Sequence, residues 1–482
     1  MGRKLTRWAR NIAAGALIVV LTIFAVRVWE SQRGAPLKPW HLVVPRELSR
    51  QEIDRADWAG WLAAENNVFR TVAEEVIREL PDGDLVPENR YYDASPVNPA
   101  RFQTDWNRTF VMEPSGPPTG AVVLLHGLTD SPFSMRHLAR LYSDRGFVAL
   151  AIRLPGHGTV PAGLTDATWE DWMAATRLAV REARRKAPSG ALHIVGYSNG
   201  GALALKYALD ALGDPALPKP DRIVLVSPMI GVTSFARFAG LAALPAHFPA
   251  FAKAAWLSVV PEFNPFKYNS FPVAAATQSH RLTQAVQAAV RARARDGVIE
   301  GLAPVLTFQS VMDFTVSSSA ILSALYAHLP ANGSEIVLFD INRSARFGPL
   351  LRRGSEYALS RLLPVGPQRF RITVVTNVSP ADADVMARVI EPGETAERSE
   401  ALGLSYPRDV YSLSHVALPF PVQDGLYGVE PDRSDDFGVR LGTLAARGEV
   451  GVLLVNLESL MRMSSNPFFP FLARRIGETL RR

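Results

Sequence analysis

The stretch at residues 192–201, L-H-I-V-G-Y-S-N-G-G, decides the fold of this chain. Apolar residues before the first glycine predict a buried strand, and the alanine- and leucine-rich run at 202–212 predicts a helix that lasts until Gly213. A strand that turns sharply into a helix at the serine of G-x-S-x-G exposes that serine as a nucleophile. The flanking glycines are expected because the serine backbone is strained and neighbouring side chains would clash. Ser198 is therefore the candidate nucleophile.

Alternating strands and helices surround this stretch. Short apolar runs predict strands at 109–112, 121–125, 147–152, 192–195, 223–226, 305–309 and 336–339. Helical runs fall between several of them, at 135–145, 169–186 and 199–212. Apolar strands separated by helices predict an α/β fold, with a mostly parallel sheet covered by helices on both faces. Functional groups are then expected at the carboxyl ends of the strands.

Two long segments interrupt the alternation. Residues 233–303 carry no strand signal and are rich in Ala, Leu, Phe and Trp, which predicts a helical cap whose apolar faces line a substrate pocket or attach the cap to the core. A second insertion at 343–410 is expected to contain a strand at 370–375 and a helix at 383–390. Before the sheet, apolar residues at helical spacing predict a helix at 50–80.

These patterns divide the chain into seven segments. They are a basic flank with a membrane anchor or signal (1–30), a helical and loop extension (31–108), the first half of the core (109–232), the cap (233–303), the second half of the core (304–342), the insertion (343–410), and a histidine loop with the C-terminal segment (411–482).

Composition excludes several classes of protein. The 482 residues are 48% hydrophobic and 20% charged, which predicts a substantial folded core. The chain contains no cysteine, so disulfides, thiolate metal sites and a cysteine nucleophile are excluded. The net charge of +6 does not indicate nucleic-acid binding, because the chain has no basic-aromatic cluster or lysine-rich tract.

The first thirty residues predict a membrane anchor. The uncharged, mostly apolar run at 12–26 follows four basic residues, Arg3, Lys4, Arg7 and Arg10. This run is shorter than the roughly 20 residues of a spanning helix, but Trp8 and Trp29 suit the two interfaces. A cleaved signal peptide has a similar pattern, and we favour an uncleaved anchor because no small-x-small cleavage site follows. The basic flank predicts the bulk of the chain on the periplasmic or extracellular side, with a bacterial inner membrane as the expected location.

The base that activates the serine is expected to be a histidine later in the chain. In this arrangement the order along the chain is nucleophile, acid, histidine. Four of the nine histidines follow Ser198: His247, His280, His328 and His415. The first two lie in the predicted cap and His328 in a helix-like run, whereas His415 lies in a loop-like segment between prolines. Elimination indicates His415 as the general base.

Two aspartates compete for the role of the orienting acid. Asp313 follows the predicted strand at 305–309, and Asp340 ends the strand at 336–339. We favour Asp313 because it leaves one strand of the sheet between the acid and the base. Either residue could instead be an ordinary helix cap.

An oxyanion hole needs two backbone N–H groups near the nucleophile. Asn199 follows the serine directly, and Leu128 lies just after the strand at 121–125, so these two residues are the candidate donors. His126 precedes the serine and is expected to be structural. No metal or organic cofactor is implied, because the chain has no H-E-x-x-H motif, phosphate-binding loop or dinucleotide fingerprint.

Four motifs together resemble one family. H-G-L-T-D-S-P at 126–132, R-L-P-G-H-G at 153–158, W-E-D-W at 169–172 and G-Y-S-N-G at 196–200 are similar to motifs of bacterial α/β-hydrolases of the carboxylesterase and monoacylglycerol lipase type, including the serine aminopeptidase S33 type. The motifs occur in the family's order. The resemblance implies an α/β-hydrolase fold and ester hydrolysis.

The resemblance is strong over residues 121–231 and returns at Asp313 and His415. It implies Ser198, Asp313 and His415 as a catalytic triad and Leu128 and Asn199 as oxyanion donors. The acid and the base lie 102 positions apart, far more than the family's usual few dozen, because the second insertion separates them.

The sequence therefore predicts a membrane-anchored serine hydrolase that acts on a small-molecule carboxylic ester with an apolar acyl group. A thioesterase, a peptidase or an acyltransferase would use the same site. A non-catalytic, membrane-tethered binding protein that kept the fold is a further alternative. No nucleic-acid partner is expected, and the oligomeric state stays open.

Overall fold

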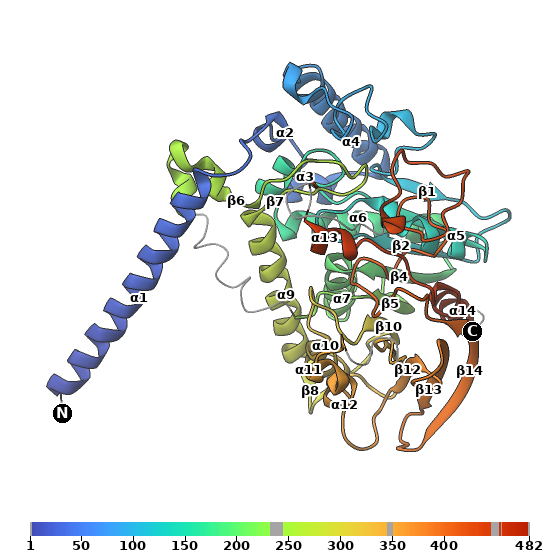
Figure 1. Ribbon diagram of the computed structural model, residues 1–482. Coiled ribbons are helices and arrows are strands. Elements are labelled where there is room, and N and C mark those ends of the chain that lie inside the picture. The colour runs from blue at the N-terminus through green and yellow to red at the C-terminus, as the bar shows by residue number, and fades with distance from the viewer. Residues whose placement is uncertain (1, 232–243, 345–349, 445–452, 455, 481–482) are drawn as a thin grey trace.

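A single mixed sheet runs through the body of the protein (Figure 1). The computed structural model describes residues 2–231, 244–344, 350–444, 453–454 and 456–480. The ten strands lie in the order β1-β3-β2-β4-β5-β10-β11-β12-β13-β14. They are β1 (Phe110–Met112), β2 (Gly120–Leu125), β3 (Phe147–Ile152), β4 (Ala191–Tyr197), β5 (Arg222–Val226), β10 (Val305–Ser310), β11 (Glu335–Phe339), β12 (Arg371–Asn377), β13 (Asp384–Ile390) and β14 (Glu397–Ser405). The strands from β3 to β12 are parallel, so the predicted sheet is confirmed.

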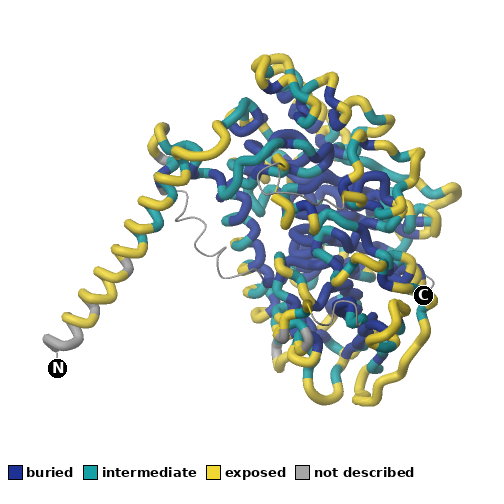
Figure 2. The backbone as a smooth tube through the Cα atoms, in the orientation of Figure 1, coloured by how far each residue is buried: buried dark blue, intermediate teal, exposed yellow. Residues whose placement is uncertain are grey.

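Helices cover both faces of this sheet, as predicted. Alternate residues of each strand point to opposite faces. In β2, Val123 packs into the core under α6 (Trp169–Lys186), α7 (Asn199–Ala211) and α9 (Val273–Arg293). Its neighbour Val122 packs on the other side, with α5 (Arg136–Ser143) and α14 (Phe469–Thr479). Each face therefore has its own buried apolar core (Figure 2).

The helix predicted at 383–390 is wrong. This segment is β13, which pairs antiparallel with both β12 and β14. Val385, Ala387 and Val389 are buried and alternate with more exposed residues, which is the period of a strand. The strand predicted at 370–375 is confirmed as β12, which pairs in parallel with β11. Much of the expected insertion at 343–410 therefore extends the central sheet.

The expectation that the cap has no strands is also wrong. β6 (Trp256–Ser258) pairs with β7 (Phe271–Pro272), and β8 (Ala294–Arg295) pairs with β9 (Val298–Ile299). Strands of two or three residues are too short to leave an alternating pattern in the sequence. The main helix of the described cap is the 21-residue α9, which packs against α7, and residues 259–270 are loop. The start of the predicted cap, within 232–243, lies outside the described residues.

The helix expected at 50–80 is divided in two. α3 (Arg50–Arg55) ends before Asp57, whose side chain accepts a hydrogen bond of 2.7 Å from the Gly60 N–H and so begins α4 (Trp58–Val72). An aspartate at this position caps a helix, because it satisfies an N–H group that has no partner within the helix.

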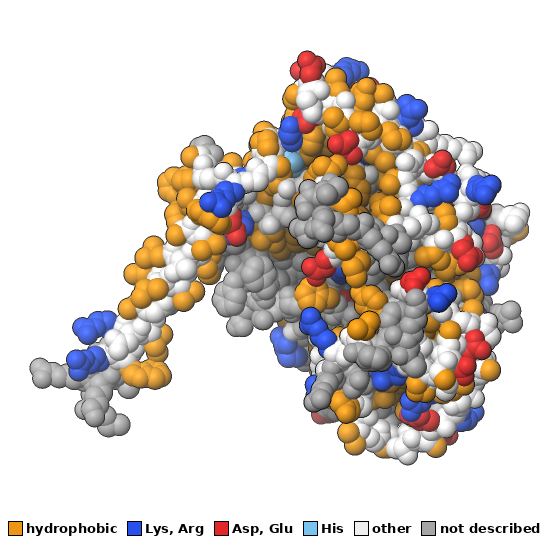
Figure 3. All heavy atoms as spheres, in the orientation of Figure 1, with side chains coloured by type: hydrophobic (Ala, Val, Ile, Leu, Met, Phe, Trp, Pro, Cys, Tyr) orange, Lys and Arg blue, Asp and Glu red, His pale blue; other side chains and the backbone are white. Residues whose placement is uncertain are grey.

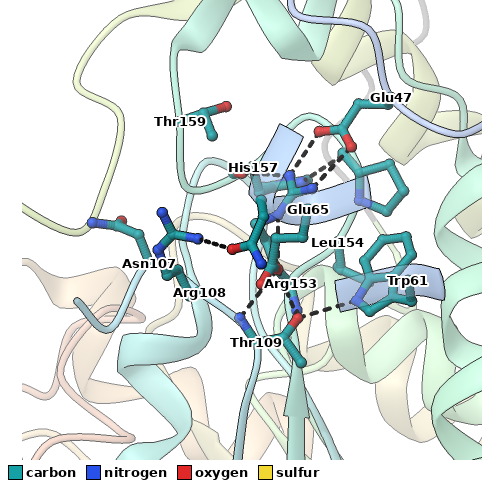
Figure 4. A network of polar contacts seen from close by, with 12 residues as sticks. Glu47, Trp61, Glu65, Asn107, Arg108, Thr109, Arg153, Leu154, His157 and Thr159 are labelled. Atoms are coloured by element: carbon teal, nitrogen blue, oxygen red, sulfur yellow. Dashed lines mark hydrogen bonds and ion pairs between the residues drawn. The ribbon is translucent and has the colours of Figure 1, made fainter. Parts of the chain in front are cut away.

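A buried ionic network ties this N-terminal extension to the sheet (Figure 4). Arg153, which follows β3, has a side chain that is 1% exposed. It donates two hydrogen bonds, of 2.7 and 2.9 Å, to the carboxylate of Glu47 and one of 3.1 Å to Glu65. A paired arginine–carboxylate contact of this kind is strong and directional. The R-L-P-G-H-G motif therefore has a structural role in this protein.

The first helix projects away from the body (Figure 1). α1 spans Gly2–Ser31, and its segment Arg10–Ser31 is 22 residues long, apolar and unburied. Figure 3 shows the apolar side chains along it. By length and composition this segment could cross a membrane, as an anchor or a signal sequence would. This segment is longer than the apolar run at 12–26 that the sequence indicates, because the helix continues through Arg27. The Arg27 guanidinium donates a hydrogen bond of 3.1 Å to the Ala254 carbonyl.

Candidate active site

Ser198 lies at a strained turn between β4 and α7. Its φ is 54° and its ψ is −115°, a conformation that L-residues rarely adopt. A Cβ atom at Gly196 would lie 2.3 Å from the Gly200 carbonyl oxygen. A Cβ atom at Gly200 would lie 2.0 Å from the Leu125 carbonyl oxygen. Both glycines are therefore required by close backbone contacts, and the predicted sharp turn is present.

Two backbone hydrogen bonds hold this turn against the neighbouring strand. The Ser198 N–H donates to the Val226 carbonyl at 3.0 Å, and the Met229 N–H donates to the Ser198 carbonyl at 2.9 Å. Leu128 follows β2 and lines the same cavity as Ser198. Asn199 is the first residue of α7, so its N–H lies at the helix N-terminus, where backbone N–H groups have no partner within the helix. One candidate oxyanion donor therefore shares a cavity with the serine, and the other follows it directly at the start of the helix.

His415 and Asp313 are 102 positions apart in the sequence and adjacent in the structure. The Nδ1 atom of His415 lies 2.8 Å from Oδ2 of Asp313, and the side chains are 5% and 0% exposed. The other oxygen of Asp313 accepts hydrogen bonds from the N–H groups of Thr315, at 2.8 Å, and Val316, at 3.0 Å. The carboxylate is thus held in one orientation, with one oxygen available to the imidazole.

The electrostatics of this pair favour an ionised carboxylate. Burial by itself would raise the pKa of Asp313. The charge and hydrogen bond of His415 and the N–H groups of Val316 and Thr315 outweigh burial and hold that pKa below its ordinary value. An ionised acid at this position fixes which imidazole nitrogen carries the proton.

Asp340 is engaged elsewhere. Its carboxylate accepts a hydrogen bond of 3.1 Å from Arg343 and one of 2.9 Å from the Thr376 hydroxyl. Two of the other histidines that follow Ser198, His280 and His328, do not line the cavity that contains Ser198. His328 Nδ1 lies 3.2 Å from the Gly297 carbonyl oxygen, and His280 is in α9. The side chain of His247 is outside the described part of the structure.

His126 is structural, as expected. Its Nε2 atom accepts a hydrogen bond of 3.1 Å from the Leu154 N–H, and its Nδ1 atom lies 2.9 Å from the Gly127 carbonyl oxygen. Burial, together with the neighbouring His157, lowers the pKa of His126 well below its ordinary value. A neutral imidazole that bonds backbone on both sides holds the loop that carries Leu128.

Two further residues, Gln309 and Tyr197, contact the acid and the base and were not predicted from the sequence. Gln309 donates a hydrogen bond of 3.1 Å to Oδ2 of Asp313, and the Tyr197 ring lies 5.5 Å from the His415 ring. Gln309 is a polar residue at the end of an apolar strand, which was a usable signal. Tyr197 gave no signal, because an aromatic residue before the serine is indistinguishable from a core residue.

A cavity of about 550 Å³ contains Ser198 and His415. Much of its wall is apolar and comes from the cap, through Leu257, Val260, Phe263 and Phe271. The cap therefore lines the pocket as well as covering the core. Within the part of the chain that the structure describes, no group of three or more Asp, Glu or His side chains could hold a metal ion.

A second histidine–aspartate pair lies outside this cavity. His137 Nε2 is 2.8 Å from Oδ2 of Asp424, which also accepts a hydrogen bond of 2.6 Å from Arg136. The N–H groups of Leu426 and Tyr427 donate to the other oxygen, at 2.9 and 2.7 Å. Burial would raise the pKa of Asp424, but Arg136, His137 and the backbone N–H of Tyr427 hold it well below its ordinary value. This pair joins α5 to the C-terminal segment.

Comparison with known proteins gives one family and one curated relative. Residues 116–341 match the family model described as serine aminopeptidase, S33. The chain is 34% identical over 87 residues to a thermostable monoacylglycerol lipase from Bacillus sp. (strain H-257). That match covers 18% of this chain and 34% of the relative, so it spans about a third of the relative's length.

Solved structures also match. A monoacylglycerol lipase from Paleococcus ferrophilus is 19% identical, with a TM-score of 0.37, over 52% of this chain and 98% of that one. A structure from work on the metagenome-derived lipolytic enzymes LipS and LipT is 21% identical, with a TM-score of 0.39, over 49% of this chain and 88% of that one. The family match, together with the sheet order and the serine turn, shows that the chain is an α/β-hydrolase whose core resembles the S33-type carboxylesterases and monoacylglycerol lipases.

Proposed function

We propose that this protein is a serine hydrolase that cleaves carboxylic esters, with Ser198 as nucleophile, His415 as general base and Asp313 as orienting acid. One observation carries the proposal. His415, hydrogen-bonded to the buried Asp313, lines the same cavity as a serine held at a strained strand-to-helix turn. The likeness to a protein named monoacylglycerol lipase adds support for ester chemistry.

The proposed reaction follows from these positions. The Ser198 hydroxyl attacks the ester carbonyl while Nε2 of His415 takes its proton, and the imidazolium is stabilised through Nδ1–H by Asp313. The N–H groups of Leu128 and Asn199 donate to the oxygen that becomes negative in the tetrahedral intermediate. His415 then protonates the leaving alcohol, and the acyl group stays on Ser198. Water, deprotonated by His415, releases the carboxylic acid and restores the serine.

The apolar cap residues of the cavity favour an apolar acyl group. Such a group would remove its surface from water against Leu257, Val260 and Phe271, with a free energy of about 25 cal/mol per Å² of apolar area. The reaction class is therefore ester hydrolysis with an acyl arm held by the cap.

Labelling with a fluorophosphonate probe tests the proposal. The purified full-length protein should be labelled covalently, and the Ser198→Ala variant should not be labelled. Ser323→Ala is the matched control, because Ser323 is an exposed serine on α10 (Ser318–Ala324) outside the cavity. A folded wild-type protein that takes up no probe would be a binding protein that kept the fold, and the proposal would fall.

We further propose that α1 anchors the protein in a membrane with the N-terminus inside and the body outside. The support is the unburied apolar segment Arg10–Ser31 behind a basic flank. The full chain should stay in the membrane fraction after an alkaline carbonate wash, and Leu21→Arg should release it. Sequencing the mature N-terminus separates an anchor from a cleaved signal, because loss of the first thirty residues would contradict the anchor.

A further inference from the structure

Two cationic side chains line the cavity that contains Ser198 and His415. Lys267 comes from the cap, and Arg462 follows the short helix α13 (Leu457–Met461) near the C-terminus. Much of the remaining wall is apolar. Neutral esters with an apolar acyl group do not need two positive charges in this position, so the charges call for an explanation.

Lys267 is held in place by the residues on either side of it. The Phe266 ring stacks on Phe133, with centroids 4.1 Å apart and planes 13° apart. The Tyr268 N–H donates to the Thr129 carbonyl at 2.8 Å, and Thr129 is next to the candidate oxyanion donor Leu128. The backbone of Lys267 is thus fixed to the oxyanion loop, and its side chain is directed by a rigid frame.

The ammonium group of Lys267 lacks a direct partner. Among the described residues, none accepts a hydrogen bond from its Nζ atom or forms an ion pair with it. Asp130 is the acidic group whose charge acts on it, without direct contact. Burial lowers the pKa of Lys267, Asp130 opposes that change, and the charge of Arg462 adds to it. A partly buried cation without a partner is costly unless a ligand supplies the negative charge.

Arg462 is fixed beside the neighbours of the acid and the base. Its Nη2 atom donates a hydrogen bond of 2.6 Å to the Thr315 hydroxyl, and the Thr315 N–H donates to Asp313 at 2.8 Å. Its carbonyl oxygen accepts a hydrogen bond of 2.6 Å from Ser414, the neighbour of His415. Its guanidinium forms no ion pair with any residue that the structure describes. A guanidinium has five N–H donors, so it can bind an anion and Thr315 together.

The charges around this part of the cavity leave it positive. Asp130 is the acidic group facing Lys267, and burial raises the pKa of its carboxyl group. Asp313 is already paired with His415. Burial disfavours the charged forms of both Lys267 and Asp130, and Arg462 adds a positive charge that no acidic group in the described structure pairs with.

We propose that Lys267 and Arg462 bind an anionic oxygen group, a carboxylate or a phosphate, of the ester substrate. The substrate class is an amphiphilic ester, with an apolar chain against the cap and one anionic group against these two residues. This inference rests on the proposed ester hydrolysis and names the substrate class of the same site.

Kinetics with matched pairs of esters test the inference. One pair is the nitrophenyl monoester of glutaric acid and its neutral methyl-capped form; the other is lauroylglycerol phosphate and neutral lauroylglycerol. The ratio of kcat/KM, anionic over neutral, should be about 10 to 100 in the wild-type protein for at least one pair, which is the range expected for charge-assisted hydrogen bonds. The pair that shows it distinguishes a carboxylate from a phosphate.

Substitutions assign the preference to the two residues. Lys267→Met and Arg462→Met should each lower the ratio at least several-fold and together bring it near one, and Lys267→Arg should keep it. Lys219→Met and Arg433→Met are matched controls, because both residues are exposed and neither lines the cavity. Thermal unfolding checks each variant, and Lys267→Gln with Arg462→Gln replaces any methionine variant that does not fold.

The two proposals fail separately. A wild-type ratio near one for both pairs, or a high ratio that survives both substitutions, overturns the anionic substrate while ester hydrolysis stands. If the folded wild-type protein is not labelled by fluorophosphonate and turns over none of the esters, the proposed ester hydrolysis is itself wrong.

Discussion

In the part of the chain that the structure describes, two histidine–aspartate pairs have the same spacing and different surroundings. In both pairs a ring nitrogen lies 2.8 Å from a carboxylate oxygen, His415 with Asp313 and His137 with Asp424. In the first pair, His415 lines a cavity of about 550 Å³ together with Ser198, and Asp313 is buried behind it. In the second pair, Asp424 also accepts a hydrogen bond from Arg136, and the pair joins α5 to the C-terminal segment. A histidine–aspartate hydrogen bond is therefore no sign of catalysis by itself; a nucleophile and an open cavity beside it are needed.

The partners of the two carboxylates explain the difference. Asp424 accepts hydrogen bonds from Arg136, His137 and two backbone N–H groups. Its negative charge is therefore neutralised mainly by the Arg136 guanidinium. Asp313 accepts from His415, Gln309 and two backbone N–H groups, and no arginine pairs with it among the described residues. The negative charge of Asp313 is therefore available to stabilise the imidazolium of His415, as a base that becomes charged during the reaction requires.

Removing the base should have the largest effect. His415→Gln is expected to lower kcat for ester hydrolysis by about 10⁶-fold, the loss seen when a serine hydrolase loses its base. His137→Gln should change kcat of the folded protein by no more than a few-fold, because that ring lies outside the cavity. Steady-state kinetics on both purified variants makes the comparison. Equal losses would mean that the two pairs do not differ in function.

Removing the acid should have the next largest effect. Asp313→Asn is expected to lower kcat by about 10⁴-fold, because the amide no longer favours the correct imidazole tautomer. Asp340→Asn should retain near-normal turnover, since Asp340 bonds Arg343 and Thr376. The assignment of the acid is wrong if the two results are exchanged.

Breaking the second pair should cost stability. Asp424→Asn removes the closer carboxylate of the buried Arg136 and leaves only the longer contact, of 3.3 Å, with Asp435, so the free energy of unfolding should fall by about 3 kcal/mol. The kcat of the folded fraction should stay close to that of the wild-type protein. Urea unfolding followed by fluorescence measures the first quantity. Unchanged stability would contradict the structural role of the pair.

The smallest effect is expected in the pH dependence of that stability. The pKa of Asp424 is lower in the folded protein than in the unfolded chain, so its contribution is complete above the unfolded pKa of about 3.9 and declines as the pH falls toward the folded value. The stability difference between wild-type and Asp424→Asn protein should therefore shrink between pH 6 and pH 3. Urea unfolding at a series of pH values checks this prediction. A stability difference that grows as the pH falls would contradict it.

Local patterns in the sequence accounted for most of the sheet. The runs at 121–125, 147–152 and 305–309 are strands in the structure because buried parallel strands are continuously apolar. The prediction for the segment at 383–390 was wrong for a physical reason. Met386, Ala387 and Arg388 favour a helix by their own propensity, and only pairing with β12 and β14 makes the segment a strand. Short hairpin strands of the cap were missed because they contain two or three residues.

The sequence by itself determined the serine turn, the α/β class and the order of the candidate residues, because each depends on neighbours in the chain. Glycines at 196 and 200 are required by close backbone contacts beside Ser198, and both glycines are part of the G-x-S-x-G motif. The identity of the acid and of the base remains a prediction that the structure makes sharper. Only the tertiary structure decided which aspartate meets His415 across 102 positions, and that Arg462 and Lys267 share one cavity. Those contacts depend on how sheet, cap and C-terminal segment pack together, and no local pattern encodes that packing.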